Sequence, residues 1–117
     1  MSPNDQLLFS LGYCILLLMI ALLFQKFQPK KINWMYGYRT QRSMRNQTIW
    51  RAANAYASKT MVKICLYGFL LPALMFFLYD THLLVITLVG HTLLVGLVIL
   101  FTELYLDKHF YSDGAVK

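Results

Sequence analysis

The stretch Leu7–Phe24 reads LLFSLGYCILLLMIALLF and contains no Asp, Glu, Lys, Arg or His over eighteen positions. An α-helix rises about 1.5 Å per residue, so this stretch nearly matches the roughly 30 Å hydrocarbon core of a bilayer. No basic residue precedes it, and no small-residue cleavage site of the A-x-A kind follows it. We therefore predict a retained transmembrane helix and not a cleaved signal peptide.

Two more apolar runs follow along the chain. The second, residues 61–79, carries one charged residue, Lys63, whose ammonium can extend to the membrane interface. The third, residues 82–106, is interrupted beyond its first position only by His91 and Glu103. At 58% hydrophobic and 14% charged, the chain is far from the soluble average of about one quarter charged. We predict one all-α membrane domain over residues 1–117, with about three transmembrane helices.

The basic residues are concentrated in the long loop between the first two spans. Nine of the eleven Lys and Arg residues lie between positions 25 and 63, where no acidic residue occurs: Lys26, Lys30, Lys31, Arg39, Arg42, Arg45, Arg51, Lys59 and Lys63. The positive-inside rule then places this loop and the C-terminus in the cytoplasm and the N-terminus outside. Attraction to anionic headgroups explains the positive charge, so we predict a lipid surface and no nucleic acid as its partner.

The loop is too long and too aromatic for a simple linker. Pro29 should interrupt the first helix, and Gly37 permits a turn with positive φ. The rings of Trp34, Tyr36 and Tyr38 suit the headgroup zone.

A further helix is predicted to begin near Met44, with Ser43 as its N-cap or Thr40 as the alternative. A polar stripe and an opposing apolar side follow helical spacing: Gln47, Arg51, Asn54 and Ser58 against Ile49, Trp50, Ala53, Tyr56 and Ala57. The pattern is typical of an amphipathic helix in the membrane interface, with Trp50 and Tyr56 at headgroup depth and Arg51 in water. This helix can also continue into the second span with a bend.

Residues 33–54, NWMYGYRTQRSMRNQTIWRAAN, resemble the signature of the SdpI family, which is close to N-x-x-x-G-Y-R-T-x-x-S-M-[KR]-N-x-x-x-W-x-x-A-N. Twelve positions match: Asn33, Gly37, Tyr38, Arg39, Thr40, Ser43, Met44, Arg45, Asn46, Trp50, Ala53 and Asn54. The resemblance implies a multi-pass protein of the bacterial cytoplasmic membrane that gives immunity to, or senses, a membrane-active peptide toxin. It also implies that the binding residues lie in the signature, and that a peptide toxin or a cytoplasmic signalling protein is the partner. Longer family members carry further spans ahead of this unit.

The signature allows two further interpretations. Arg39, Arg42 and Arg45 are spaced by threes, and on a helix near a helix N-terminus they could hold a phosphate or carboxylate together with nearby hydroxyls. The alternative is general attraction to headgroups plus helix capping. Trp50 and Asn54 lie one turn apart and are expected to pack and hydrogen-bond the helix to the bundle.

The third span carries a polar arc. His91 lies near mid-membrane, while Thr92, Gly96 and Glu103 share one helical face. The arc could form a path for protons or contact a toxin. We favour the alternative, a neutral histidine bonded to a neighbouring helix, with Glu103 pairing a basic loop residue.

Four other residues inside the spans are interpreted as structural. Gly68 and Pro72 predict close packing and a kink in the second span. Cys14 and Cys65 fall within predicted spans and are expected to act as small apolar packing residues.

Nothing in the sequence indicates catalysis. It has no Gly-rich phosphate loop, nucleophile elbow or H-E-x-x-H motif, and we predict neither cofactor nor metal. The alternative to a binding role is a small transporter or exporter that works as an oligomer. Such proteins generally need a membrane-embedded carboxylate, and Glu103 lies near the predicted interface.

Overall fold

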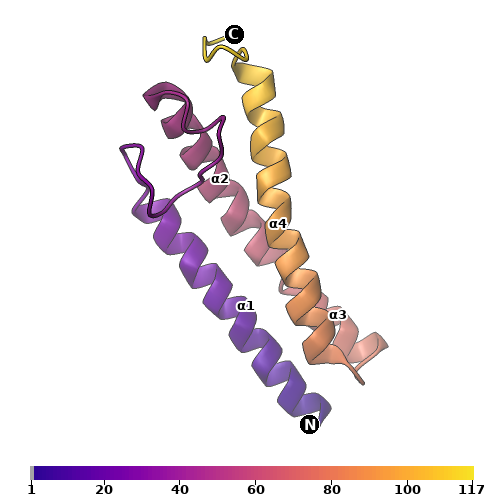
Figure 1. Ribbon diagram of the computed structural model, residues 1–117. Coiled ribbons are helices and arrows are strands. Elements are labelled where there is room, and N and C mark those ends of the chain that lie inside the picture. The colour runs from indigo at the N-terminus through magenta and orange to yellow at the C-terminus, as the bar shows by residue number, and fades with distance from the viewer. Residues whose placement is uncertain (1) are drawn as a thin grey trace.

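The computed structural model describes residues 2–117 and contains four helices (Figure 1). They are α1 (Pro3–Lys26), α2 (Gln47–Tyr67), α3 (Leu70–Leu78) and α4 (Leu83–His109). Because α3 continues α2 after a short break, three rods are long and apolar enough to cross a membrane: Pro3–Lys26, Gln47–Leu78 and Leu83–His109. The prediction of an all-α membrane protein with three spans is confirmed.

The three rods form an elongated bundle of 53 × 24 × 18 Å. In Figure 1, α1 and α4 run in the same direction, and α2 with α3 runs against them. The long loop and the C-terminus therefore lie at one end of the bundle, and the N-terminus lies at the other. At the N-terminal end, Gln6 donates to the carbonyl of Thr81 at 3.3 Å and accepts from the amide of Leu84 at 3.1 Å.

Local chemistry explains the bounds of α1. The Ser2 hydroxyl accepts from the amide of Asp5 at 3.2 Å, Pro3 occupies the first helical position, and Asp5 complements the positive end of the helix dipole. The helix ends at Lys26, three residues before Pro29, as predicted.

The start of α2 corrects one prediction. The helix begins at Gln47 and not near Met44, and its N-cap is Asn46, whose side chain accepts from the amide of Ile49 at 2.9 Å. Ser43 is not the cap because its hydroxyl bonds within the preceding loop. From Gln47 the helix continues to Tyr67, so the predicted interfacial helix is the first part of the second membrane-crossing rod.

The predicted kink lies between α2 and α3. Pro72 has no N–H to donate to the carbonyl of Gly68 four residues earlier. That carbonyl accepts instead from the amide of Leu71 at 3.2 Å, and the Cys14 thiol approaches it at 3.8 Å. The freed carbonyl thus becomes a contact between the second span and α1.

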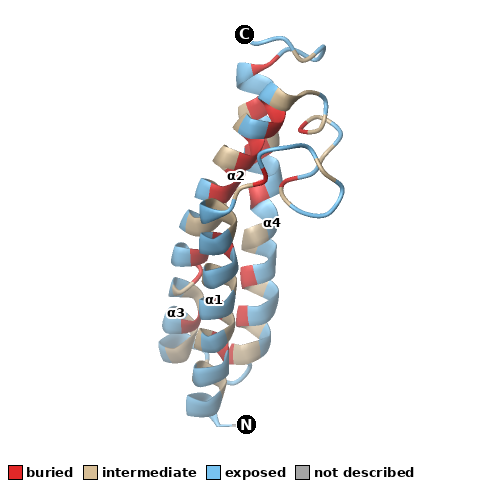
Figure 2. Ribbon diagram, turned by 90° about the vertical axis from the view of Figure 1, so that its left-hand side faces the viewer, coloured by how far each residue is buried: buried red, intermediate tan, exposed pale blue. Residues whose placement is uncertain are grey.

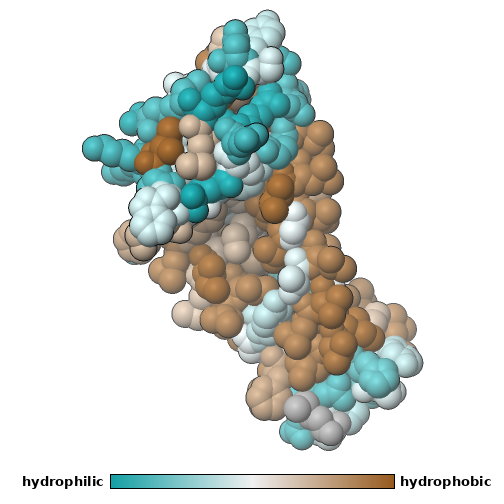
Figure 3. Space-filling model, viewed as in Figure 1, coloured by the Kyte–Doolittle hydropathy of each residue, from teal (hydrophilic) through white to brown (hydrophobic). Residues whose placement is uncertain are grey.

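Burial and hydropathy are both unevenly distributed over the bundle. Figure 2 shows buried residues on the inward faces of the helices, many of them where α2 and α4 pack near the C-terminal end. The outer faces carry exposed apolar side chains such as Leu16, Phe77 and Leu93. In Figure 3, apolar residues cover much of the bundle and polar residues gather at the end that holds the C-terminus. This distribution suits a bundle surrounded by lipid, with a polar cap.

Candidate functional site

The signature loop folds back onto α2 through Asn54. Its side-chain oxygen accepts from the amide of Tyr38 at 2.7 Å, and its amide nitrogen donates to the carbonyls of Trp50 at 2.9 Å and Tyr38 at 3.4 Å. Gly37, with φ of 107°, makes the turn that presents Tyr38 to this side chain. Asn54 is 1% exposed, so these bonds are shielded from water and lipid.

Trp50 closes the other side of the loop. Its indole N–H donates to the carbonyl of Pro29 at 2.8 Å, and the side chain is fully buried. The prediction that Trp50 packs and bonds its helix to the bundle is confirmed, whereas its predicted exposure to lipid is wrong because the loop covers it. Arg51 is exposed as predicted, and Tyr56 is half-buried, stacked on Tyr105 with ring centroids 4.3 Å apart.

The remaining small polar residues of the signature shape the loop itself. The Ser43 hydroxyl accepts from the amide of Thr40 at 2.8 Å and lies 3.0 Å from the carbonyl of Tyr38, while the Thr40 hydroxyl accepts from the amide of Ser43 at 3.1 Å. Asn33 accepts from the amides of Met35 and Tyr36, both at 2.9 Å. These side chains stabilise the loop conformation, and few of their donors and acceptors remain free to bind a ligand.

Two signature residues, Arg45 and Asn46, hold the C-terminal segment together with the neighbouring Arg42. Arg42 forms an ion pair with Asp107 and donates to the carbonyl of Phe110 at 3.0 Å. Arg45 donates to the carbonyl of Ser112, and Asn46 donates to that of Gly114 at 3.2 Å. The loop and the end of α4 are therefore tied together by charged and amide donors.

The predicted three-arginine face does not form. Residues 41–44 adopt a turn, not a helix, so the spacing by threes does not align the guanidinium groups. Arg42 and Arg45 line a cavity of about 410 Å³ with Gln41 and Ser112. Arg39 is exposed, does not line this cavity, and has neither a hydrogen bond nor an ion pair within residues 2–117.

A second cavity of about 500 Å³ lies directly beneath the signature loop. It is mainly apolar and is lined by α1, α2, the loop and α4: Ile20, Phe24, Tyr36, Gly37, Tyr38, Ala57, Met61, Thr92, Val95, Gly96, Val98 and Ile99. Ile20, Gly96 and Ile99 are exposed at the bundle surface, so the cavity is an open groove. We call it the loop groove. It joins part of the signature to Thr92 and Gly96 of the predicted polar arc.

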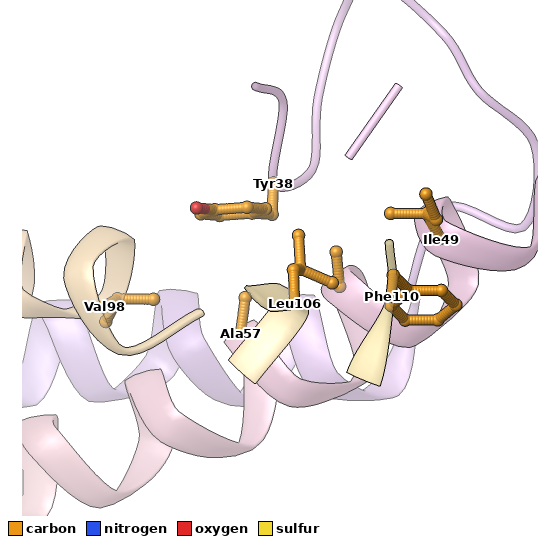
Figure 4. Packing of buried hydrophobic residues seen from close by; sticks show 7 residues of the cluster. Tyr38, Ile49, Ala57, Val98, Leu106 and Phe110 are labelled. Atoms are coloured by element: carbon orange, nitrogen blue, oxygen red, sulfur yellow. The ribbon is translucent and has the colours of Figure 1, made fainter. Parts of the chain in front are cut away.

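Tyr38 connects the loop to the core beside this groove. Its ring packs with buried residues of α2 and α4, including Ala57, Val98 and Leu106 (Figure 4). Its hydroxyl donates to the carbonyl of Ile99 at 3.2 Å. Burial raises the pKa of the Tyr38 phenol above its ordinary value, and the neighbouring Glu103 carboxylate raises this pKa further. Tyr38 therefore stays a neutral donor at physiological pH.

Glu103 does not pair a basic loop residue, contrary to the prediction. Among the described residues the only ion pair joins Arg42 to Asp107, one helical turn after Glu103. Glu103 lies beside Tyr38 instead, and one of its oxygens is buried without a hydrogen bond.

His91 lies in the bundle core, apart from the loop groove. Its Nδ1 is 3.3 Å from the Cys14 thiol, and the Tyr13 ring meets it edge-on with centroids 5.9 Å apart. The favoured prediction of a histidine bonded to a neighbouring helix is confirmed. The next residue, Thr92, turns to the groove side, where its hydroxyl bonds that of Tyr13 at 2.6 Å.

The structure adds to the roles predicted for the cysteines. Cys14 and Cys65 are both free and fully buried. Cys14 packs as predicted and also contacts the second span and α4 through its thiol. Within residues 2–117, no three His, Cys, Asp or Glu side chains are grouped so that they could hold a metal ion.

The sequence alone did not identify the loop groove. Its apolar members on α1 and α2, such as Ile20, Phe24 and Met61, resemble any lipid-facing or packing residue. Six of its members have predicted roles, namely Tyr36, Gly37, Tyr38, Ala57, Thr92 and Gly96, but these roles differ and the residues lie too far apart in the sequence to indicate a shared cavity.

Comparisons with known proteins agree with the signature. A model of the SdpI/YfhL protein family matches residues 30–102. The chain is 45% identical over 47 residues to a Bacillus subtilis (strain 168) protein described as "Uncharacterized protein YfhL"; the match spans 40% of this chain and 43% of that protein. No solved structure matches the chain.

Proposed function

Because the chain belongs to the SdpI/YfhL protein family, we propose that it confers immunity to, or senses, a membrane-active peptide without catalysing a reaction. The observation that carries this proposal is the loop groove, an apolar cavity of about 500 Å³ that opens between membrane-crossing helices. A peptide inserted in the bilayer meets this groove sideways, without leaving the hydrocarbon region.

The groove suits an apolar segment held by packing. Gly96 has no side chain, and a Cβ built there meets nothing within 4 Å, so a partner helix can approach the α4 backbone closely. The hydroxyls of Tyr36 and Tyr38 donate to carbonyls of this chain, at Phe27 and Ile99. Hydrogen bonds from these hydroxyls therefore contribute less to peptide binding than the shape of the groove does. Sensing would also need a cytoplasmic signalling protein, for which the polar end of the bundle offers a surface.

Filling the groove should abolish protection. We expect Gly96→Leu to lower survival of a peptide-sensitive strain to the level of cells that lack the protein, because the new side chain occupies the groove. The matched control is Gly12→Leu, since Gly12 also has nothing within 4 Å of its Cβ position and does not line the groove. Survival is measured against purified membrane-active peptides, with membrane-fraction immunoblots to confirm equal insertion. Equal survival of the two variants would show that the groove is not the binding site.

We also propose that the chain sits in the cytoplasmic membrane with its N-terminus outside and its C-terminus inside. The supporting observation is charge. The loop between α1 and α2 lies at the C-terminal end of the bundle and carries five basic residues and no acidic one: Lys30, Lys31, Arg39, Arg42 and Arg45. In a background without Cys14 and Cys65, an impermeant maleimide should label Thr81→Cys in intact cells. Lys31→Cys should react only after permeabilisation; both positions are exposed. Labelling of Lys31→Cys from outside would reverse this topology.

A further inference from the structure

The cavity lined by Arg42 and Arg45 is polar, unlike the loop groove. It measures about 410 Å³ and lies between the loop and the C-terminal segment, lined by Gln41, Arg42, Arg45 and Ser112. These residues precede the start of α2 or follow the end of α4, so the cavity belongs to the polar end of the bundle (Figures 1 and 3). The bundle is 53 Å long, whereas a bilayer with its headgroups is about 40–45 Å thick. This end therefore reaches the headgroup layer or the water beyond it.

The cavity is positively charged. Two of its four lining residues are arginines, and none is acidic. Arg42 is partly neutralised, because one terminal nitrogen pairs with Asp107 and the other donates to main-chain carbonyls. Arg45 is exposed and pairs with no carboxylate in the described part of the chain. Its charge is left for an external anion.

Arg45 is also positioned for such an anion. A single nitrogen, Nη1, donates to the carbonyl of Ser112, which fixes the side chain at the cavity and leaves Nη2 and Nε without a partner in residues 2–117. A guanidinium edge with two parallel N–H donors matches two oxygens of one phosphate. The Gln41 amide and the Ser112 hydroxyl line the same space and also make no hydrogen bond in the described structure, so they can supply further donors.

We propose that this cavity binds a phosphate group, either of an anionic lipid headgroup or of free phosphate, with Arg45 as the bidentate donor. Gln41 and Ser112 complete the set of donors, and Arg42 contributes charge while it holds the C-terminal segment. Arg39 lies outside the site. The binding role therefore falls on Arg45, whose place in the signature gives no indication that it differs from Arg39.

The test uses the full chain labelled with [15N]arginine in phosphatidylcholine nanodiscs. In one arm, inorganic phosphate is titrated, and in the other, phosphatidylglycerol replaces part of the lipid. The Arg45 Nε–H resonance should shift in a saturable way in at least one arm. A shift with inorganic phosphate identifies free phosphate as a ligand, and a shift with phosphatidylglycerol alone identifies the headgroup. Either result supports the site, and no shift in either arm overturns it.

Three variants test whether phosphate binds in this cavity or is attracted by the overall positive charge of the protein. Arg45→Gln should weaken binding at least tenfold, followed through the Arg42 resonance. Gln41→Leu should weaken it severalfold while keeping both arginines and the contact to Ser112. Lys59→Gln is the charge-matched control, because Lys59 is exposed on α2 and does not line the cavity; it should change affinity less than twofold. Equal losses for Arg45→Gln and Lys59→Gln, or an unchanged Gln41→Leu, would overturn the site.

Discussion

Replacing Gly37 by alanine should unfold the signature loop and remove any activity that depends on it. At φ of 107° an L side chain is strained, and its Cβ would lie 2.6 Å from Cγ of Pro29 and 2.8 Å from the side-chain oxygen of Asn54. Pro29 and Asn54 are both buried, so neither can move aside without losing packing or hydrogen bonds. Backbone strain of about 1–3 kcal/mol and an unpaired buried amide at about 1–3 kcal/mol predict a loss of roughly 2–6 kcal/mol.

Thermal unfolding of the purified protein in detergent measures this effect. The control is Gly12→Ala, where a Cβ meets nothing within 4 Å and alanine favours the helix. We expect that control to unfold at or above the wild-type temperature. If Gly37→Ala unfolded at the wild-type temperature too, the turn at Gly37 and its contact with Asn54 would not be the arrangement that holds the loop.

The second large effect concerns the contact of Gly68 with His91. A Cβ at Gly68 would overlap the His91 ring, with 2.6 Å to Nε2 and 2.8 Å to Nδ1. His91 is fully buried and its Nδ1 contacts Cys14, so the ring has little room to move. Gly68→Ala should therefore destabilise the bundle by roughly 1–3 kcal/mol, the usual range for overpacking.

A double-mutant cycle separates this clash from a general effect on the kink. His91→Ala alone removes the ring and the thiol contact and should also destabilise. In Gly68→Ala/His91→Ala the new methyl group enters the space that the ring leaves. The double variant should thus be more stable than the sum of the single losses, by about 0.5–3 kcal/mol. Strict additivity would mean that Gly68 serves only the helix break and not the packing of α4.

These contacts change the interpretation of the signature. Asn33, Thr40, Ser43, Trp50 and Asn54 bond to the main chain of the same loop or of α2. The signature is therefore first a folding motif that seats one aromatic ring, Tyr38, over the junction of α2 and α4. The two binding roles that we propose belong to surfaces that this motif helps to form, the loop groove and the arginine-lined cavity at the polar end.

The sequence by itself determined the three spans and the kink. Both follow from properties that neighbouring residues share: an uncharged stretch long enough for the bilayer, and Gly68 followed by Pro72, whose missing N–H frees the Gly68 carbonyl. The tie between Trp50, Asn54 and the bundle was also predictable, because one helical turn places both on the same face.

Tertiary structure alone decided how the loop is used. Ser43 and Asn46 are both good N-caps, and the choice fell to Asn46 because the Ser43 hydroxyl bonds within the loop. An amphipathic pattern distinguishes two faces of a helix, but it does not say whether lipid or protein covers them, so Trp50 was assigned to lipid and lies beneath the loop. The groove joins residues from position 20 to position 99, and the partners of the arginines lie more than sixty residues away. Such contacts depend on how the rods pack and where the loop folds back, which no local pattern encodes.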